Sequence, residues 1–130
     1  MTKKLDRVRR LGIDAETAWI WNVRQRHTRA PDTVTDCRLV LSLRREGTQR
    51  RLEITFRPAP GRIVSDGYWE SGTVVSHGIW LNLYEPGVVR RLLAAATASG
   101  TLPARAGTVE ADGWPLFDAV TAAGPRAPAG

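Results

Sequence analysis

Hydrophobic and polar residues alternate with a period of two on both sides of a glycine-containing turn, between Asp36 and Arg57. Such alternation around a short turn predicts a β-hairpin. A tip at Gly47 and Thr48 suits a type II′ turn, because the first central position of that turn needs a positive φ. The resulting register pairs the apolar residues with one another: Leu43 with Leu52, Leu41 with Ile54, and Leu39 with Phe56.

The other face of this hairpin sets arginine against arginine. Directly opposed like charges are destabilising, by roughly 0.2–1 kcal/mol per pair if they mirror the favourable pairs. The arrangement therefore requires either an acidic neighbour or an anionic partner. The opposed pairs in the predicted register are Arg38 with Arg57, Arg44 with Arg51, and Arg45 with Arg50.

Patterns outside the hairpin predict strands first and helices afterwards, which indicates an α+β fold. Residues 17-28 alternate as a strand does, and a helix across 14-28 is the alternative because its first residues resemble a cap. Later, apolar residues recur at i, i+3 and i+4 after Pro86, and Gly100 follows the last of them. The expected elements are an antiparallel meander of four to five strands (about residues 17-28, 35-46, 49-57, 73-75 and 79-83) and two C-terminal helices (about 86-99 and 115-123) packed on one sheet face.

The chain has 130 residues, of which 42% are hydrophobic, so one domain with a sizeable core is expected. We assign this domain to residues 13-124, with an irregular link at 101–113. Residues 1-12 are predicted to form a basic N-terminal arm or a short helix that ends at Gly12. Residues 125-130 form a Pro/Ala tail that is expected to be frayed.

The net charge of +6 is distributed unevenly along the chain. Residues 1–62 carry 15 Lys or Arg against 7 Asp or Glu, a net of +8, whereas residues 63–130 carry 4 against 6, a net of −2. This asymmetry predicts an electropositive half that meets nucleic acid or an acidic protein. A high-GC bacterial coding bias also raises arginine content, since only two of the basic residues are lysines, but it does not explain their placement.

Several chemistries are excluded or disfavoured by residues that the chain lacks. No lysine follows Lys4, so a Walker A loop is excluded, and the single Cys37 excludes an intrachain disulfide or a multi-cysteine zinc site. Cys37 shares the leucine face, so we expect it to be buried. The remaining acid/base candidate is His77 with Asp66 or Glu70, and a solvated turn residue is the favoured interpretation of His77. An enzyme is therefore disfavoured, and no cofactor or metal is expected.

No apolar run approaches the length of a membrane span, and the N-terminus lacks an apolar signal core, so a cytoplasmic protein without membrane association is expected. Our hypothesis is a small non-enzymatic binding module whose arginine-rich sheet face engages a polyanion, foremost nucleic acid, largely independently of sequence. The alternative is a protein–protein interaction module (an adaptor, an inhibitor or immunity-like protein, or a regulatory subunit) that binds an acidic partner or forms a homo-oligomer. The predicted polyanion-binding residues are Arg24, Arg26, Arg38, Arg44, Arg45, Arg50, Arg51 and Arg57, with Trp69 and Trp80 as candidates for base stacking.

Overall fold

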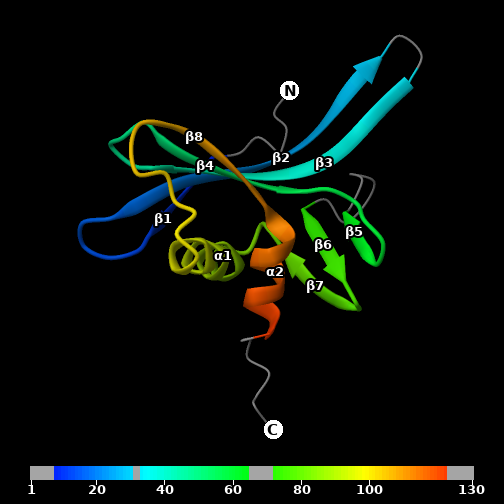
Figure 1. Cartoon of the computed structure of the whole chain (residues 1–130). Coiled ribbons are helices and arrows are strands. Elements are labelled where there is room, and N and C mark those ends of the chain that lie inside the picture. The colour runs from blue at the N-terminus through cyan, green and yellow to red at the C-terminus, as the bar shows by residue number, and fades with distance from the viewer. Residues whose placement is uncertain (1–7, 31–32, 65–71, 123–130) are drawn as a thin grey trace, which may run out of the picture.

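A five-stranded mixed sheet forms one layer of the molecule, and two helices cover one of its faces (Figure 1). The computed structural model describes residues 8–30, 33–64 and 72–122, with the backbone alone for residues 28–30 and 33–36. Four strands run antiparallel to their neighbours, and the fifth, β8, runs parallel to β4. The strand order is β1 (Arg9–Gly12), β2 (Ala18–Ala30), β3 (Thr33–Arg45), β4 (Arg50–Phe56) and β8 (Gly107–Asp112).

A second, smaller sheet lies beside the helices (Figure 1). It contains β5 (Arg62–Val64), β6 (Thr73–Ser76) and β7 (Ile79–Asn82), all antiparallel. The helices are α1 (Pro86–Ala98), with proline in its first turn, and α2 (Gly113–Ala122). The predicted α+β class is confirmed. None of the helices in the described residues has the length and apolar character needed to cross a membrane.

The register of the β3–β4 hairpin is confirmed, but its turn differs from the prediction. Leu43 lies opposite Leu52 and Arg44 lies opposite Arg51, as the alternation requires. The backbone N–H of Thr48 donates to the carbonyl of Arg45 at 3.1 Å, and Gly47 has a φ of 84°. Gly47 is therefore the third residue of a four-residue turn, where type II geometry needs a positive φ, rather than the first central residue of a type II′ turn. Both turns leave the same residues opposite each other.

Three further elements differ from the expectation. Residues 9–12 form strand β1, where an arm or a helix was expected, and β2 resolves the strand-or-helix alternative in favour of a strand. Strands β6 and β7 form near the predicted positions, but they belong to the second sheet, in which β6 pairs with β5 and with β7, instead of extending the meander. The predicted irregular link contains β8, whose only apolar residues beyond glycine are Val109 and Ala111.

One cluster of buried side chains joins both sheets and both helices. The leucines of β3 and β4 contribute to it, together with Val74 and Leu81 from the second sheet. The Phe56 and Trp114 rings meet edge to face with their centroids 5.1 Å apart, and Trp114 Nε1 donates to the carbonyl of Arg57 at 2.7 Å. The aromatic contact therefore fixes the start of α2 against the end of β4.

The β2–β3 hairpin extends well beyond the body of the molecule (Figure 1). Each of its strands has 13 residues, and its register shifts between Arg26 and Thr28. Cys37 lies in this projecting part and is exposed, so the prediction that it is buried is wrong. Alternation places Cys37 on the same face of the sheet as Leu39. It is nevertheless exposed, because the helices do not extend under this end of the hairpin (Figure 1).

Candidate functional site

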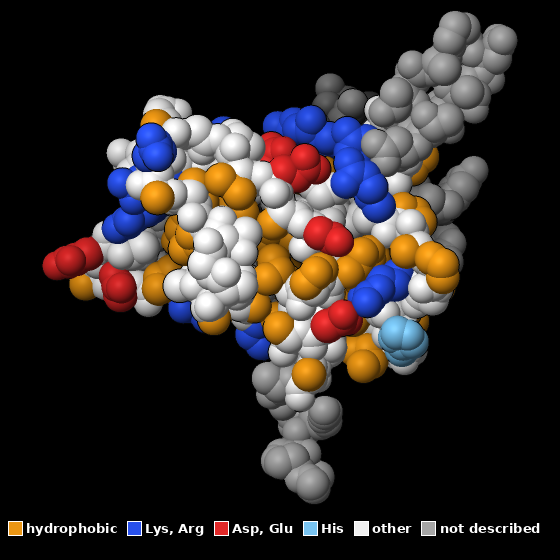
Figure 2. Space-filling model, in the orientation of Figure 1, with side chains coloured by type: hydrophobic (Ala, Val, Ile, Leu, Met, Phe, Trp, Pro, Cys, Tyr) orange, Lys and Arg blue, Asp and Glu red, His pale blue; other side chains and the backbone are white. Residues whose placement is uncertain are grey.

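The face of the main sheet that points away from the helices carries arginines from four consecutive strands. Alternation assigns these residues to this face, because their neighbours in each strand are the buried residues of the core. Figure 2 shows basic side chains along this side of the body, with acidic side chains immediately beside them. We call it the arginine face and define it by Arg10, Arg24, Arg26, Arg38, Arg44, Arg51 and Arg57.

One row of directly paired residues crosses the arginine face near the β3–β4 turn. It contains the opposed pair Arg44 and Arg51, which the sequence predicts. The two guanidinium groups point to different acceptors: Arg51 Nη1 donates to Ser42 Oγ at 3.1 Å, and Arg44 Nη1 donates to the Thr48 carbonyl at 3.2 Å. Each positive charge thus has its own acceptor, which lowers the cost of opposing them.

Two carboxylates compensate charge at the margins of the face. Arg10 Nε lies 3.0 Å from Glu46 Oε2, and its Nη2 lies 3.1 Å from Glu46 Oε1, so the pair is bidentate. The pKa of Glu46 is lowered, first by this hydrogen bond. Strand β8 adds Glu110, whose Oε2 accepts a hydrogen bond from Thr55 Oγ1 at 3.1 Å and lies 3.7 Å from Arg57 Nη2. The acidic neighbour required by the opposed arginines is therefore partly supplied by β8.

Three further arginines lie at the base of the projecting hairpin, where β2 and β3 leave the body of the molecule. Arg26 lies directly opposite Arg38, and Arg24 is exposed two residues away. None of residues 22–27 and 37–42 is acidic. In the middle of the face Asn22, Ser42, Val40 and Thr55 are buried, and the half-exposed Glu53, which pairs with Ser42, adds a carboxylate there.

Two predicted polyanion-binding arginines lie on the opposite side of the sheet. Arg45 is paired with Trp19, and Arg50 is paired with Gly107, which places both on the side of the sheet that the helices cover. Arg38 and Arg57 do not pair in the ladder, because β4 ends at Phe56. The predicted set is thus divided between two faces.

The aromatic candidates do not join the arginine face. Trp80 is 59% exposed, but it belongs to β7 in the second sheet. Trp69 lies outside the described residues. In the second sheet Trp80 pairs with Val75, which in turn pairs with Ile63, and Ile63 is 61% exposed. These three residues form an apolar row on the side of the second sheet that faces away from the core.

His77 occupies a turn with a φ of 52°, and its predicted partners Asp66 and Glu70 lie outside the described residues. Its Nδ1 lies 3.1 Å from Ser76 Oγ, but Ser76 is only 1% exposed and cannot reach a substrate as a nucleophile. The pKa of Asp118 is lowered, first by hydrogen bonds from Arg62 and further by the charges of Arg62 and His77. The described residues contain no group of three potential metal ligands.

Arg62 and Asp118 instead form a structural link between β5 and α2. The two Nη atoms of Arg62 each lie 3.0 Å from a different carboxylate oxygen of Asp118. The guanidinium carbon also lies 5.1 Å from the centroid of the Trp114 ring. These contacts hold the second sheet against the C-terminal helix.

No known protein family, curated protein or solved structure matches this chain. Its class is therefore defined by its own features: an α+β protein with an arginine face and a projecting hairpin. Sequence reasoning missed Glu110 and Asp112 as neighbours of the basic residues. Their parallel alignment with Glu53 and Thr55 depends on a long chain connection, which residue patterns do not reveal.

Proposed function

We propose that this protein is a non-enzymatic binding module whose arginine face engages nucleic acid, largely independently of base sequence. The observation that carries the proposal is the base of the projecting hairpin, where Arg26 opposes Arg38 and Arg24 is exposed beside them. A row of phosphates would offset this repulsion and accept hydrogen bonds from the guanidinium groups.

The shape of the hairpin also supports nucleic acid among polyanions. The paired strands β2 and β3 extend away from the body as a two-stranded ribbon (Figure 1). A ribbon of this kind fits the major groove of B-form DNA, which is about 12 Å wide. In this arrangement Arg24 and Arg26 contact the phosphates that flank the groove, and such contacts position a protein without reading the sequence.

The test compares two double variants that lose the same charge. Arg24→Gln with Arg26→Gln removes two residues of the arginine face, and Arg91→Gln with Arg105→Gln removes two exposed arginines elsewhere. Fluorescence anisotropy is measured with labelled single- and double-stranded oligonucleotides between about 50 and 200 mM salt. We expect the first variant to reduce the slope of log K against log salt by about 2 and the second to leave it nearly unchanged. No binding by the unmodified protein at about 50 mM salt, or equal losses in both variants, would overturn the proposal.

A second candidate function is protein–protein interaction, with an acidic partner or a second copy. The observation that favours it is the apolar row of Ile63, Val75 and Trp80, because exposed tryptophans and apolar patches are enriched at interfaces. Light scattering after size exclusion, across salt concentrations, distinguishes the two functions. Self-association that Trp80→Ser abolishes and Arg24→Gln does not would favour this second function.

A further inference from the structure

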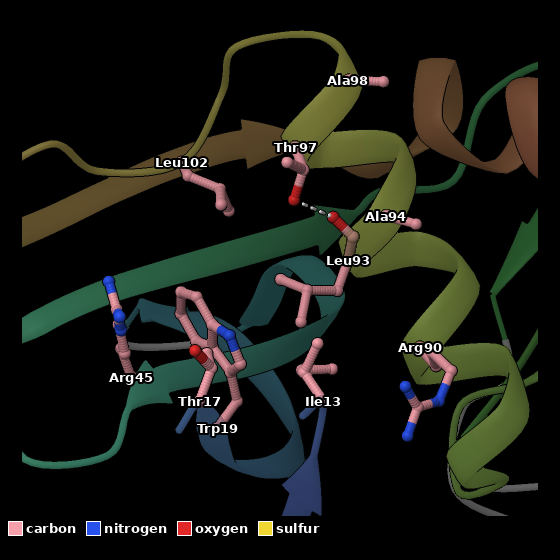
Figure 3. A pocket seen from close by; sticks show the side chains of 10 residues that line it. All are labelled: Ile13, Thr17, Trp19, Arg45, Arg90, Leu93, Ala94, Thr97, Ala98 and Leu102. Atoms are coloured by element: carbon pink, nitrogen blue, oxygen red, sulfur yellow. Dashed lines mark hydrogen bonds between the residues drawn. The ribbon is translucent and has the colours of Figure 1, made fainter. Parts of the chain in front are cut away.

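An open groove of about 660 Å³ lies between α1 and the main sheet (Figure 3). Trp19 from β2 and Leu93 from α1 point toward each other across it, and Ile13 and Leu102 lie on either side. Thr97 projects from α1 on the same side as Leu93, whereas the short side chains of Ala94 and Ala98 point away from the indole (Figure 3). Its volume falls within the range of roughly 300–1,000 Å³ that is typical of small-molecule sites.

Two arginines from different elements border this groove, and no acidic residue lines it. Arg90 from α1 donates through Nη2 to the carbonyl of Gly12, so its guanidinium is tied to the end of β1. Arg45, at the end of β3, lies on the other side of the groove in Figure 3. No hydrogen bond joins the Arg45 guanidinium to another residue in the described ranges. Its donors therefore remain for a ligand.

Asp14 interacts electrostatically with Arg45, but its carboxylate is hydrogen-bonded within its own loop. Asp14 Oδ1 accepts backbone hydrogen bonds from Glu16 and Thr17, both at 2.8 Å. The pKa of Asp14 is lowered, first by the hydrogen bond from the backbone of Glu16 and to a smaller extent by the charge of Arg45. The Asp14 carboxylate thus stabilises its own loop through these hydrogen bonds. Arg45 places a positive charge at the rim of an apolar groove.

We propose that this groove binds a small amphiphilic carboxylate, such as a medium-chain fatty acid. The carboxylate is held by Arg45, and the alkyl chain lies over Trp19 and Leu93 along α1. The lining residues of α1 run from Arg90 to Ala98, a length of roughly 12 Å at 1.5 Å per residue, which suits a medium-length chain. An apolar wall with one guanidinium at its rim selects ligands that combine these two properties.

Calorimetric titration of the full chain with octanoate, octanol and octylamine tests this proposal. Octanoate is expected to bind saturably, octanol more weakly, and octylamine not at all, because its ammonium group would be repelled by Arg45. Arg45→Gln is expected to weaken octanoate binding about tenfold, since a charge-assisted pair is lost. Arg44→Gln is the matched control, because the adjacent side chain belongs to the arginine face and does not line the groove.

A second pair of variants tests the position of the alkyl chain. Thr97→Phe fills the groove and is expected to abolish octanoate binding, whereas Ala119→Phe places the same ring on an exposed position of α2. Thermal unfolding midpoints verify that each variant is folded. The proposal is overturned if octanoate does not saturate below about 1 mM, if octylamine binds equally well, or if Thr97→Phe binds normally. These outcomes do not bear on nucleic-acid binding by the arginine face. Either proposal can therefore fail while the other stands.

Discussion

Gly113 begins α2 at the place where this helix meets the sheet. A β-carbon at this position would stand 2.5 Å from Cε1 of Phe56. The Phe56 ring is fully buried and is held edge to face by Trp114, so it cannot move aside without disturbing the core. We expect Gly113→Ala to destabilise the fold by about 1–3 kcal/mol, as measured by urea denaturation.

Gly87 provides the matched control for this prediction. It lies in the first turn of α1, and a β-carbon there meets nothing within 4 Å. Alanine in a helix is favoured over glycine by up to about 1 kcal/mol, so Gly87→Ala is expected to preserve or increase stability. Equal losses in both variants would mean that the Phe56 contact is not the cause.

Asp118 makes the stability of the fold depend on pH in the acidic range. Because the hydrogen bonds from Arg62 lower its pKa, the folded state binds a proton less readily than the unfolded state. The contribution of Asp118 is therefore present above its ordinary pKa and is lost as the pH falls through its lower folded-state pKa. We expect Asp118→Asn to lower the thermal midpoint at neutral pH and to flatten its decline between about pH 5 and pH 2.

Glu85→Gln is the control for the acid dependence. Glu85 is exposed at the start of α1, and its side chain makes no capping hydrogen bond. Its replacement is expected to leave the shape of the pH profile unchanged. A decline that persists in full in Asp118→Asn would show that other carboxylates cause it.

Strand β8 limits the charge of the arginine face, because it brings Glu110 next to Arg57. If this face binds nucleic acid, Glu110→Gln removes a repulsive charge and the carboxylate that lies 3.7 Å from Arg57 Nη2. We expect binding to an oligonucleotide to tighten about twofold at low salt, and the gain to shrink as salt increases. Glu16→Gln, in an exposed loop, is the control in the same anisotropy titration. Weaker binding by Glu110→Gln would contradict the assignment of this face.

The strands with regular alternation were predictable, and so were the positions of β6 and β7, whereas β1, β5 and β8 were not. The β3–β4 register follows from the leucine alternation alone, and it holds although the turn around Gly47 was assigned to the wrong type. β1 has only four residues, and β8 pairs with β4 across a long connection, so neither leaves a pattern that spans enough residues. Cys37 shows a related limit, because alternation assigns a face but not the length of the layer that covers it.

The same limit affected the candidate site. Arg44 and Arg45 are consecutive in β3 and therefore point to opposite faces of the sheet. The prediction that both residues belong to one basic surface did not take this alternation into account. The structure assigns Arg44 to the arginine face and Arg45 to the groove with Trp19, a contact that depends on where α1 lies.

At the scale of the whole molecule, the two sheets share one core. Leu81 of β7 belongs to the same buried cluster as Trp19 and Trp21 of β2. A shared core predicts that both sheets unfold in one cooperative transition. Leu81→Ala is therefore expected to cost about 2–5 kcal/mol and to shift the urea midpoint equally when it is followed by tryptophan fluorescence and by circular dichroism.

Ile79 is the control for this coupling, because it lies on the same strand but is 46% exposed. Ile79→Ala removes little buried area and is expected to cost much less than Leu81→Ala. If Leu81→Ala split the transition, so that circular dichroism and tryptophan fluorescence gave different midpoints, the second sheet would be an independent unit. A single transition would instead mean that the contacts of β5, β6 and β7 with the helices transmit stability to the sheet that carries the arginine face.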